Sequence, residues 1–191
     1  MMSLSEMAEV FSVKGISKSP AIFDINKLNW LNGEYIRKMT IDEFTKTAMP
    51  FYKQAVKREV DFNALSSCLI NRTEKFSDIP EQLDFIDELP DYSIDLYVHK
   101  KMKTTPENSL ESLKALLPVL EEINDYSTEN LHTELMALIE KLGVKNGIVL
   151  WPLRVALSGK AFTPGGGIEL ANILGKDEVI ARVKKGIEKL S

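Results

Sequence analysis

Apolar residues recur at three- and four-residue intervals along most of the chain, a spacing that puts them on one face of a helix. The clearest series consist of leucines: Leu110, Leu113, Leu117 and Leu120, then Leu131, Leu135, Leu138 and Leu142. No alternating apolar–polar run is long enough to predict a strand. The pattern therefore predicts an all-α fold of about ten helices in two small bundles.

Capping signals mark several helix ends. Ser3 with Glu6 and Thr40 with Glu43 have the spacing of capping boxes. A glycine, Gly143, is placed to end the second leucine-rich helix. The predicted helices cover approximately residues 3–11, 24–36, 40–48, 61–72, 77–86, 105–120, 127–142, 147–158, 163–174 and 177–190.

Two breaks in the helical pattern divide the chain. The polar, basic stretch His99–Thr105 is the better internal boundary, and an earlier break lies near Lys38–Thr40. We expect three parts, residues 1–39, 40–104 and 105–191. The first part has one good helix and cannot bury its own apolar face, so it is predicted to be the tail of a larger region.

Composition narrows the class of protein. The 191 residues are 44% hydrophobic and 27% charged, as in ordinary globular proteins. A net charge of −4 argues against a nonspecific nucleic-acid binder but allows a local basic patch. The longest apolar run, Ile148–Leu153, is too short for a bilayer, and no signal peptide is visible. The single cysteine, Cys68, points to a reducing compartment, so a cytoplasmic protein is predicted.

Catalytic and cofactor motifs are missing from the sequence. His99 and His132 have no partner at metal-ligand spacing. Gly165-Gly166-Gly167 superficially resembles a phosphate loop, but no strand precedes it and no Lys-Ser/Thr follows. A flexible helix start is the better interpretation. We expect no catalytic residue, metal or cofactor within this chain.

The most informative stretch is Lys145–Ile168. It predicts an apolar helix ended by Gly159, a short basic loop, and a second helix opened by Thr163 and Pro164. Arg154, Lys160, Thr163 and the N–H groups of the second helix would then lie close together, where a phosphate or a base edge can bind. Arg154 lies among apolar residues, so it must either point outward or find a partner. A structural salt bridge is the alternative to a functional role.

Two blocks of the chain resemble bacterial glutamyl-tRNA synthetases, a class I family. Lys145–Ile168 resembles the last conserved block of that family. A second block matches a segment of the family's stem-contact region through Phe23, Asp24, Lys27, Leu28, Trp30, Asn32, Gly33, Tyr35 and Ile36. Gly15–Ser19 resembles the class I lysine–serine loop but lacks its first lysine, so it is interpreted as a linker. The chain thus resembles a C-terminal fragment without the catalytic domain.

The resemblance implies a set of site residues. Arg154, Thr163, Pro164 and Gly166 would contact anticodon bases, with Lys160 beside them. Arg72 aligns with a position whose arginine checks the third anticodon base in some members; a solvated helix-end cation is the equally good alternative. Possible contacts to the tRNA stem are Lys27, Asn29 and Trp30.

The resemblance also implies a function. The fragment would recognise the anticodon of tRNA-Glu, as a monomer. The intact enzyme would use ATP and Mg²⁺ to join glutamate to tRNA, whereas this chain alone would be inactive. The competing hypothesis, drawn from the acidic charge and polar surface, is a helical protein–protein interaction module that does not bind RNA.

Overall fold

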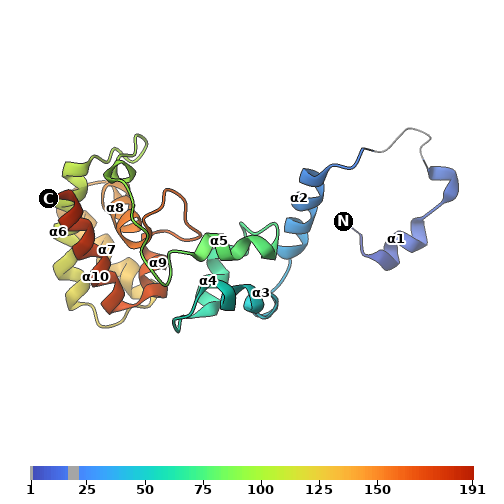
Figure 1. The fold of residues 1–191 in the computed structure, drawn as a ribbon, viewed down its shortest axis with the longest axis horizontal. Helices are drawn as coiled ribbons and strands as arrows, with labels where there is room; N and C mark the ends of the chain where they lie inside the picture. The colour runs from blue at the N-terminus through green and yellow to red at the C-terminus, as the bar shows by residue number, and fades with distance from the viewer. Residues whose placement is uncertain (1, 17–21) are drawn as a thin grey trace.

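A computed structural model describes residues 2–16 and 22–191, and these residues form helices without a β-strand (Figure 1). The all-α prediction is confirmed. A lone antiparallel bridge joins His99 and Thr104. The ten α-helices of the described residues are α1 (Leu4–Val10), α2 (Ile25–Ile36), α3 (Ile41–Ala55), α4 (Phe62–Leu69), α5 (Ile79–Leu83), α6 (Pro106–Glu122), α7 (Thr128–Leu142), α8 (Asn146–Ser158), α9 (Gly167–Leu174) and α10 (Lys176–Leu190). Short 3₁₀ segments occupy Val13–Gly15, Phe76–Asp78 and Ile94–Tyr97.

The two predicted capping boxes and the predicted glycine end of α7 are found in the structure. Ser3 and Thr40 each accept a hydrogen bond from a backbone N–H while Glu6 and Glu43 bond back to the cap residue. Gly143 ends α7 in the left-handed conformation, with φ of 65°. Such local signals act within one turn of helix, so they can be identified from sequence alone.

The prediction of a single helix over residues 77–86 was wrong, because the α-helix there is shorter. A 3₁₀ segment, Phe76–Asp78, comes first, and α5 then covers only Ile79–Leu83. After Leu83 the chain turns, with the Ile86 N–H donating to the carbonyl of Leu83 at 2.9 Å. The carbonyls of Phe85 and Ile86, which the last turn of a helix would leave unpaired, accept hydrogen bonds from the Arg182 side chain of α10. This partner lies about a hundred residues away along the chain, and the local apolar pattern carries no sign of it.

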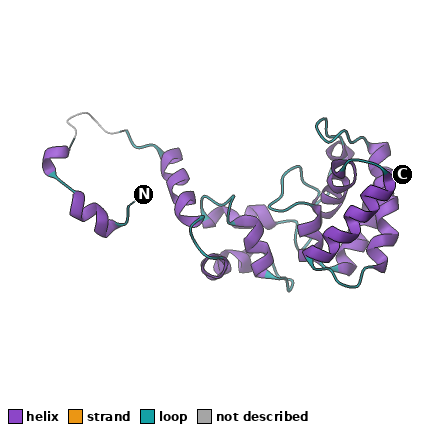
Figure 2. Cartoon of the chain, turned by 180° about the vertical axis from the view of Figure 1, so that it is seen from behind, coloured by secondary structure: helices purple, strands orange, loops and turns teal. Residues whose placement is uncertain are grey.

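The helices pack in two groups joined along one continuous core (Figure 2). In the first group, α3, α4 and α5 bury Phe44, Leu65 and Leu83 completely. In the second, α6 and α10 lie side by side and both pack on α8, while α9 packs on α8 and α10. Leu113 and Val183 are fully buried there. Helix α1 buries no residue, and α2 buries only Gly33 and Ile36. Residues 17–21, which include the Ser-Lys-Ser end of the lysine–serine-like motif, lie outside the described part.

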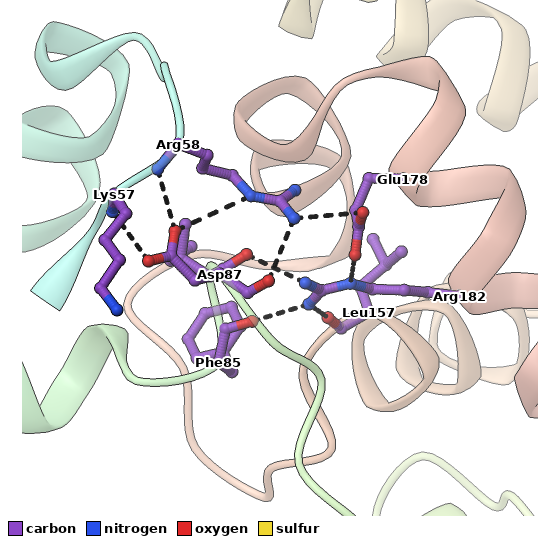
Figure 3. A network of polar contacts seen from close by, with 8 residues as sticks. Lys57, Arg58, Phe85, Asp87, Leu157, Glu178 and Arg182 are labelled. Atoms are coloured by element: carbon purple, nitrogen blue, oxygen red, sulfur yellow. Dashed lines mark hydrogen bonds and ion pairs between the residues drawn. The ribbon is translucent and has the colours of Figure 1, made fainter.

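A buried arginine joins the two groups (Figure 3). Arg182 is 1% exposed and donates hydrogen bonds to the carbonyls of Phe85 and Leu157, at 2.8 and 2.6 Å. It also donates to the carbonyl of Ile86 at 2.9 Å and to the Glu178 carboxylate at 2.6 Å. We call these five residues the Arg182 cluster. A guanidinium suits this place because it offers five N–H donors in a fixed plane.

A second arginine reinforces the same junction. Arg58, just after α3, forms an ion pair with Glu178 at 3.1 Å and donates to the carbonyl of Asp87. The Asp87 carboxylate in turn accepts hydrogen bonds from the backbone N–H groups of Lys57 and Arg58 (Figure 3). Desolvation raises the pKa of Glu178, but Arg182 and Arg58 outweigh it and hold that pKa below its ordinary value. Glu178 therefore stays ionised between two cations.

The described residues contain neither a membrane-spanning helix nor a cluster of metal-binding side chains. Among residues 2–16 and 22–191, no helix has both the length and the apolar character needed to cross a membrane. The same ranges hold no group of three or more His, Cys, Asp or Glu side chains placed to bind a metal ion.

Candidate nucleic-acid interface

The loop between α8 and α9, residues 160–166, is the centre of the candidate site and is called the corner loop. Gly159 ends α8 with φ of 63°, a conformation that other residues adopt only at a cost. A β-carbon at Gly159 would also approach Tyr92 Cδ1 to 2.8 Å. This glycine therefore sets the direction in which the corner loop leaves α8.

The predicted helix start at Thr163 was wrong, because α9 begins at Gly167. The Thr163 hydroxyl donates to the carbonyl of Gly165 at 2.6 Å and so does not cap a helix. The Gly166 N–H is also engaged, donating to the Glu169 carboxylate at 2.9 Å. Consecutive glycines are poor helix residues, which explains why the helix starts late. Thr163 and Pro164 are buried in the corner loop, whereas Gly166 is exposed.

Arg154 reaches the corner loop from α8 and is half-buried. Its Nη2 donates to the carbonyl of Ala161 at 2.5 Å, and its guanidinium carbon lies 4.1 Å from the centre of the Trp151 ring. The partners of this arginine are thus a carbonyl and an indole, a different arrangement from the structural salt bridge considered as the alternative. Its Nε is buried and has no hydrogen-bond partner among the described residues. Burial, followed by the positive charge of Arg72, lowers the pKa of Arg154.

Arg72 reaches the same loop from the first helical group. It follows α4, and its Nη1 donates to the carbonyl of Thr163 at 3.0 Å. The Arg72 side chain is otherwise exposed. The structure therefore brings together two arginines that are 82 positions apart in the sequence and that were singled out separately.

Lys160 is turned toward α5 and is neutralised there. Its ammonium group forms an ion pair with Asp84 and donates to the carbonyl of Glu81 at 3.3 Å. An ammonium already paired with a carboxylate attracts a phosphate less strongly than a free one. Lys160 thus contributes less positive charge to the site than its sequence position suggested.

Three hollows surround the corner loop. The first, of about 220 Å³, is bordered by Arg72, Lys160, Phe162, Thr163 and Pro164, and also by Glu81 and Gln82. The second, of about 420 Å³, lies between Phe162, Arg154 and Trp151, with Val98, His99 and Met102 among its other walls. The third, of about 350 Å³, is bordered by Arg154, Trp151, Leu150 and Gly166. Each arginine therefore faces at least one recess on the surface.

Sequence reasoning missed three aromatic residues of this region. Phe162 is 88% exposed on the corner loop. Trp151 donates its indole N–H to the carbonyl of Leu96 at 2.9 Å. The centres of the His99 and Trp151 rings lie 3.9 Å apart. A signal for Phe162 was available, since it is a large apolar residue in a short loop that also contains lysine, proline and glycine, outside the helical apolar pattern. No comparable signal marks the pairing of His99 with Trp151.

The suggested stem contacts lie apart from this site. Lys27, Asn29 and Trp30 are on α2, which lies across the first helical group from α8 and α9 (Figure 1). The Trp30 side chain is 53% exposed and Lys27 is exposed, whereas Asn29 is half-buried. The structure thus forms one compact site from Arg72, Arg154 and the corner loop, and a separate exposed surface on α2.

Cys68 lies beneath the corner loop and gives a direct test of its packing. Burial raises the pKa of its thiol to about 11, the charge of Glu169 adds to the rise, and Arg72 opposes it. Since the thiolate is the reacting form, we expect a disulfide reagent at pH 8 to label the folded chain on the order of 100-fold more slowly than the urea-unfolded chain.

The pH dependence of the labelling rate separates this cause from simple obstruction. In the folded chain the rate constant should keep rising to pH 10, whereas in the unfolded chain it should level off near the ordinary thiol pKa of about 8.5. Equal rates in the two states would contradict the described packing of Cys68.

The geometry suits single-stranded bases better than a small-molecule reaction. Guanidinium groups offer paired donors to base edges, and exposed aromatic rings offer faces for stacking. Recesses beside them can receive bases that have left a stacked strand. The residues of the site come from the segment after α4, from α8 and from the chain around His99. The shape of the site therefore depends on how the two helical groups are held together.

Comparisons with known proteins identify the family of the chain. Residues 43–187 match the family model described as an anticodon binding domain. The chain is 58% identical over 188 residues to a glutamate–tRNA ligase of Clostridium tetani, covering 98% of this chain and 38% of that protein. It is 55% identical over 191 residues to a glutamate–tRNA ligase of Clostridium acetobutylicum, covering 100% of this chain and 39% of that protein.

Solved structures show the same fold. A glutamate–tRNA ligase from Elizabethkingia meningosepticum superposes with a TM-score of 0.82 at 23% identity, covering 100% of this chain and 37% of that one. The corresponding protein of Elizabethkingia anophelis gives a TM-score of 0.78. The chain spans less than two fifths of the length of these curated and structural relatives, and it matches their C-terminal part.

Proposed function

Because the chain belongs to the anticodon-binding domain family and corresponds to the C-terminal part of glutamate–tRNA ligases, we propose that it binds the anticodon loop of tRNA-Glu. The observation that carries the proposal is the pair of arginines on the corner loop. Arg72 and Arg154 donate to the carbonyls of Thr163 and Ala161, two positions apart in that loop, and border neighbouring hollows. Flipped-out bases need such donors and recesses for recognition.

The remaining site residues are proposed to contribute to RNA binding in different ways. Thr163 and Pro164 are buried parts of the first hollow, so they shape it more than they reach out of it. Gly166 is exposed at the third hollow, where a nucleotide backbone can approach closely. Lys160 would contribute less to phosphate binding, because its charge is paired with Asp84. Lys27, Asn29 and Trp30 are proposed to contact the tRNA stem from α2.

The proposal extends to the longer protein that the relatives represent. That enzyme would activate glutamate with ATP and Mg²⁺ and transfer it to tRNA, in the cytoplasm and as a monomer. This chain would select and position the tRNA. Of the predicted parts, residues 40–104 would supply Arg72 and residues 105–191 would supply Arg154 and the corner loop. No ATP-dependent activation of glutamate is expected from residues 1–191 alone.

A binding comparison tests the proposal. The chain should bind a tRNA-Glu transcript more tightly than an unrelated tRNA, with both affinities falling between about 50 and 200 mM salt. Fluorescence anisotropy with labelled transcripts gives both dissociation constants. Equal, weak binding to the two RNAs would favour the competing hypothesis of a protein–protein interaction module. One observation supports that alternative: large apolar side chains on and before α2 are exposed, including Phe23 at 77%.

A further inference from the structure

Phe162 is exposed in a loop whose other residues are fixed. The ring is 88% exposed, although Thr163, Pro164 and Gly165 directly after it are buried. Leaving a phenylalanine in water gives up the favourable burial of its apolar surface. Folding of the described residues therefore offers no reason for a large aromatic side chain at this position.

The backbone on each side of Phe162 is held by a different arginine. Arg154 donates to the carbonyl of Ala161, the preceding residue, and Arg72 donates to the carbonyl of Thr163, the following residue. The Thr163 hydroxyl adds a bond to the carbonyl of Gly165. The exposed ring is thus carried on a short stretch of backbone with fixed attachments rather than on a free loop.

The ring also separates two of the hollows. Phe162 borders the hollow of about 220 Å³ that contains Arg72 and the hollow of about 420 Å³ that contains Arg154. A cation therefore lies on each side of one aromatic ring, and each side has space for a planar group. Aromatic side chains placed this way stack on unpaired bases of any identity, because every base has a π-face.

We propose that Phe162 inserts between two consecutive unstacked anticodon nucleotides, with one base on the Arg72 side and the next on the Arg154 side. This inference rests on the proposed function and adds a division of roles to it. The arginines distinguish bases by hydrogen bonds, whereas Phe162 supplies affinity that does not depend on base identity. It also separates neighbouring nucleotides so that each faces one arginine.

The test compares four variants with the unaltered chain on the same RNAs. Phe162→Ala, Phe162→Leu and Phe162→Tyr are measured beside Phe11→Ala, which removes an exposed phenylalanine away from the corner loop. The probes are a tRNA-Glu transcript and transcripts with single changes in the anticodon. Phe162→Ala and Phe162→Leu should weaken binding by about tenfold or more for every transcript, leaving the ratios between transcripts unchanged. Phe162→Tyr keeps the ring and should bind as the unaltered chain does, as should Phe11→Ala.

A stacking readout completes the test. An anticodon stem-loop carrying 2-aminopurine in the anticodon should lose fluorescence on binding the unaltered chain and Phe162→Tyr, and lose less on binding Phe162→Leu at saturation. Circular dichroism should show the same thermal midpoint for all variants, since the ring is exposed.

Each outcome separates the two proposals. If the unaltered chain binds tRNA-Glu selectively and Phe162→Ala binds equally well, the inserted ring is refuted and the proposed function stands. If Phe162→Leu retains full affinity and quenching, stacking is refuted in favour of simple apolar contact. If the unaltered chain shows no selective binding, both proposals fail.

Discussion

Replacing Arg182 by methionine is expected to lower the free energy of unfolding by about 3–5 kcal/mol, the range found when one partner of a buried charged network is removed. Four hydrogen bonds disappear together, and three of their acceptors are main-chain carbonyls. A methionine can replace the aliphatic part of the arginine side chain but donates no hydrogen bond. The buried carbonyls of the Arg182 cluster are then left without a partner, which is the costly part of the change.

Two further variants separate this cost from a general effect of charge. Lys184→Met removes a cation from the same helix, but Lys184 is about half exposed and its ion pair with Glu121 is on the surface, so the loss should stay below about 1 kcal/mol. Arg182→Lys keeps the charge without the planar set of donors and should fall between the two. Urea unfolding followed by circular dichroism gives the three values. Similar losses for Arg182→Met and Lys184→Met would contradict the role assigned to the buried cluster.

Replacing Arg72 or Arg154 by alanine is expected to weaken binding of tRNA-Glu by on the order of 1–3 kcal/mol, with each change relaxing selectivity at a different anticodon position. The two positions should differ because the arginines border different hollows. Arg154 has a buried Nε with no partner among the described residues, so a base edge or phosphate that reached it would satisfy that donor. The measurement is a matrix of dissociation constants for the two variants against transcripts with single anticodon changes.

The controls for this matrix remove charge or geometry separately. Lys185→Ala removes one exposed cation from α10 and should weaken binding little and equally for all transcripts. Arg154→Lys retains the charge but loses the paired donors, so it should show most of the selectivity loss of Arg154→Ala. Uniform losses across all transcripts for both alanine variants would reduce Arg72 and Arg154 to phosphate contacts or supports of the corner loop.

Local chemistry made much of the fold predictable. Ser127 and Gly143 fix the ends of α7 because a cap and a left-handed glycine act on the nearest backbone groups. The same reasoning failed at Thr163, where a threonine followed by proline has the form of a helix start. The following glycines and the tertiary bond from Arg72 hold Thr163 in a loop instead.

Two arginines of the site could be predicted from the sequence, but their arrangement in space could not. Arg72 and Arg154 were both singled out, but their convergence on the two sides of Phe162 in one loop depends on the packing of α4 against α9. Arg182 went unnoticed because its run of basic residues, with Lys184, Lys185 and Lys189, has the look of a solvated helical face. Only the partner carbonyls, contributed by distant segments, distinguish the buried member from its neighbours.

The Arg182 cluster has a thermodynamic consequence for RNA recognition. Since its charges are sealed from solvent or paired across the junction, dissolved ions screen them far less than they screen charges that meet phosphate. Raising ionic strength should then weaken the attraction to RNA while the distance between Arg72 and Arg154 stays constant. The conformational entropy of fixing that distance is lost once, when the polypeptide folds. Binding therefore starts from a preorganised surface, and the entropic penalty for ordering it does not recur with each transfer RNA.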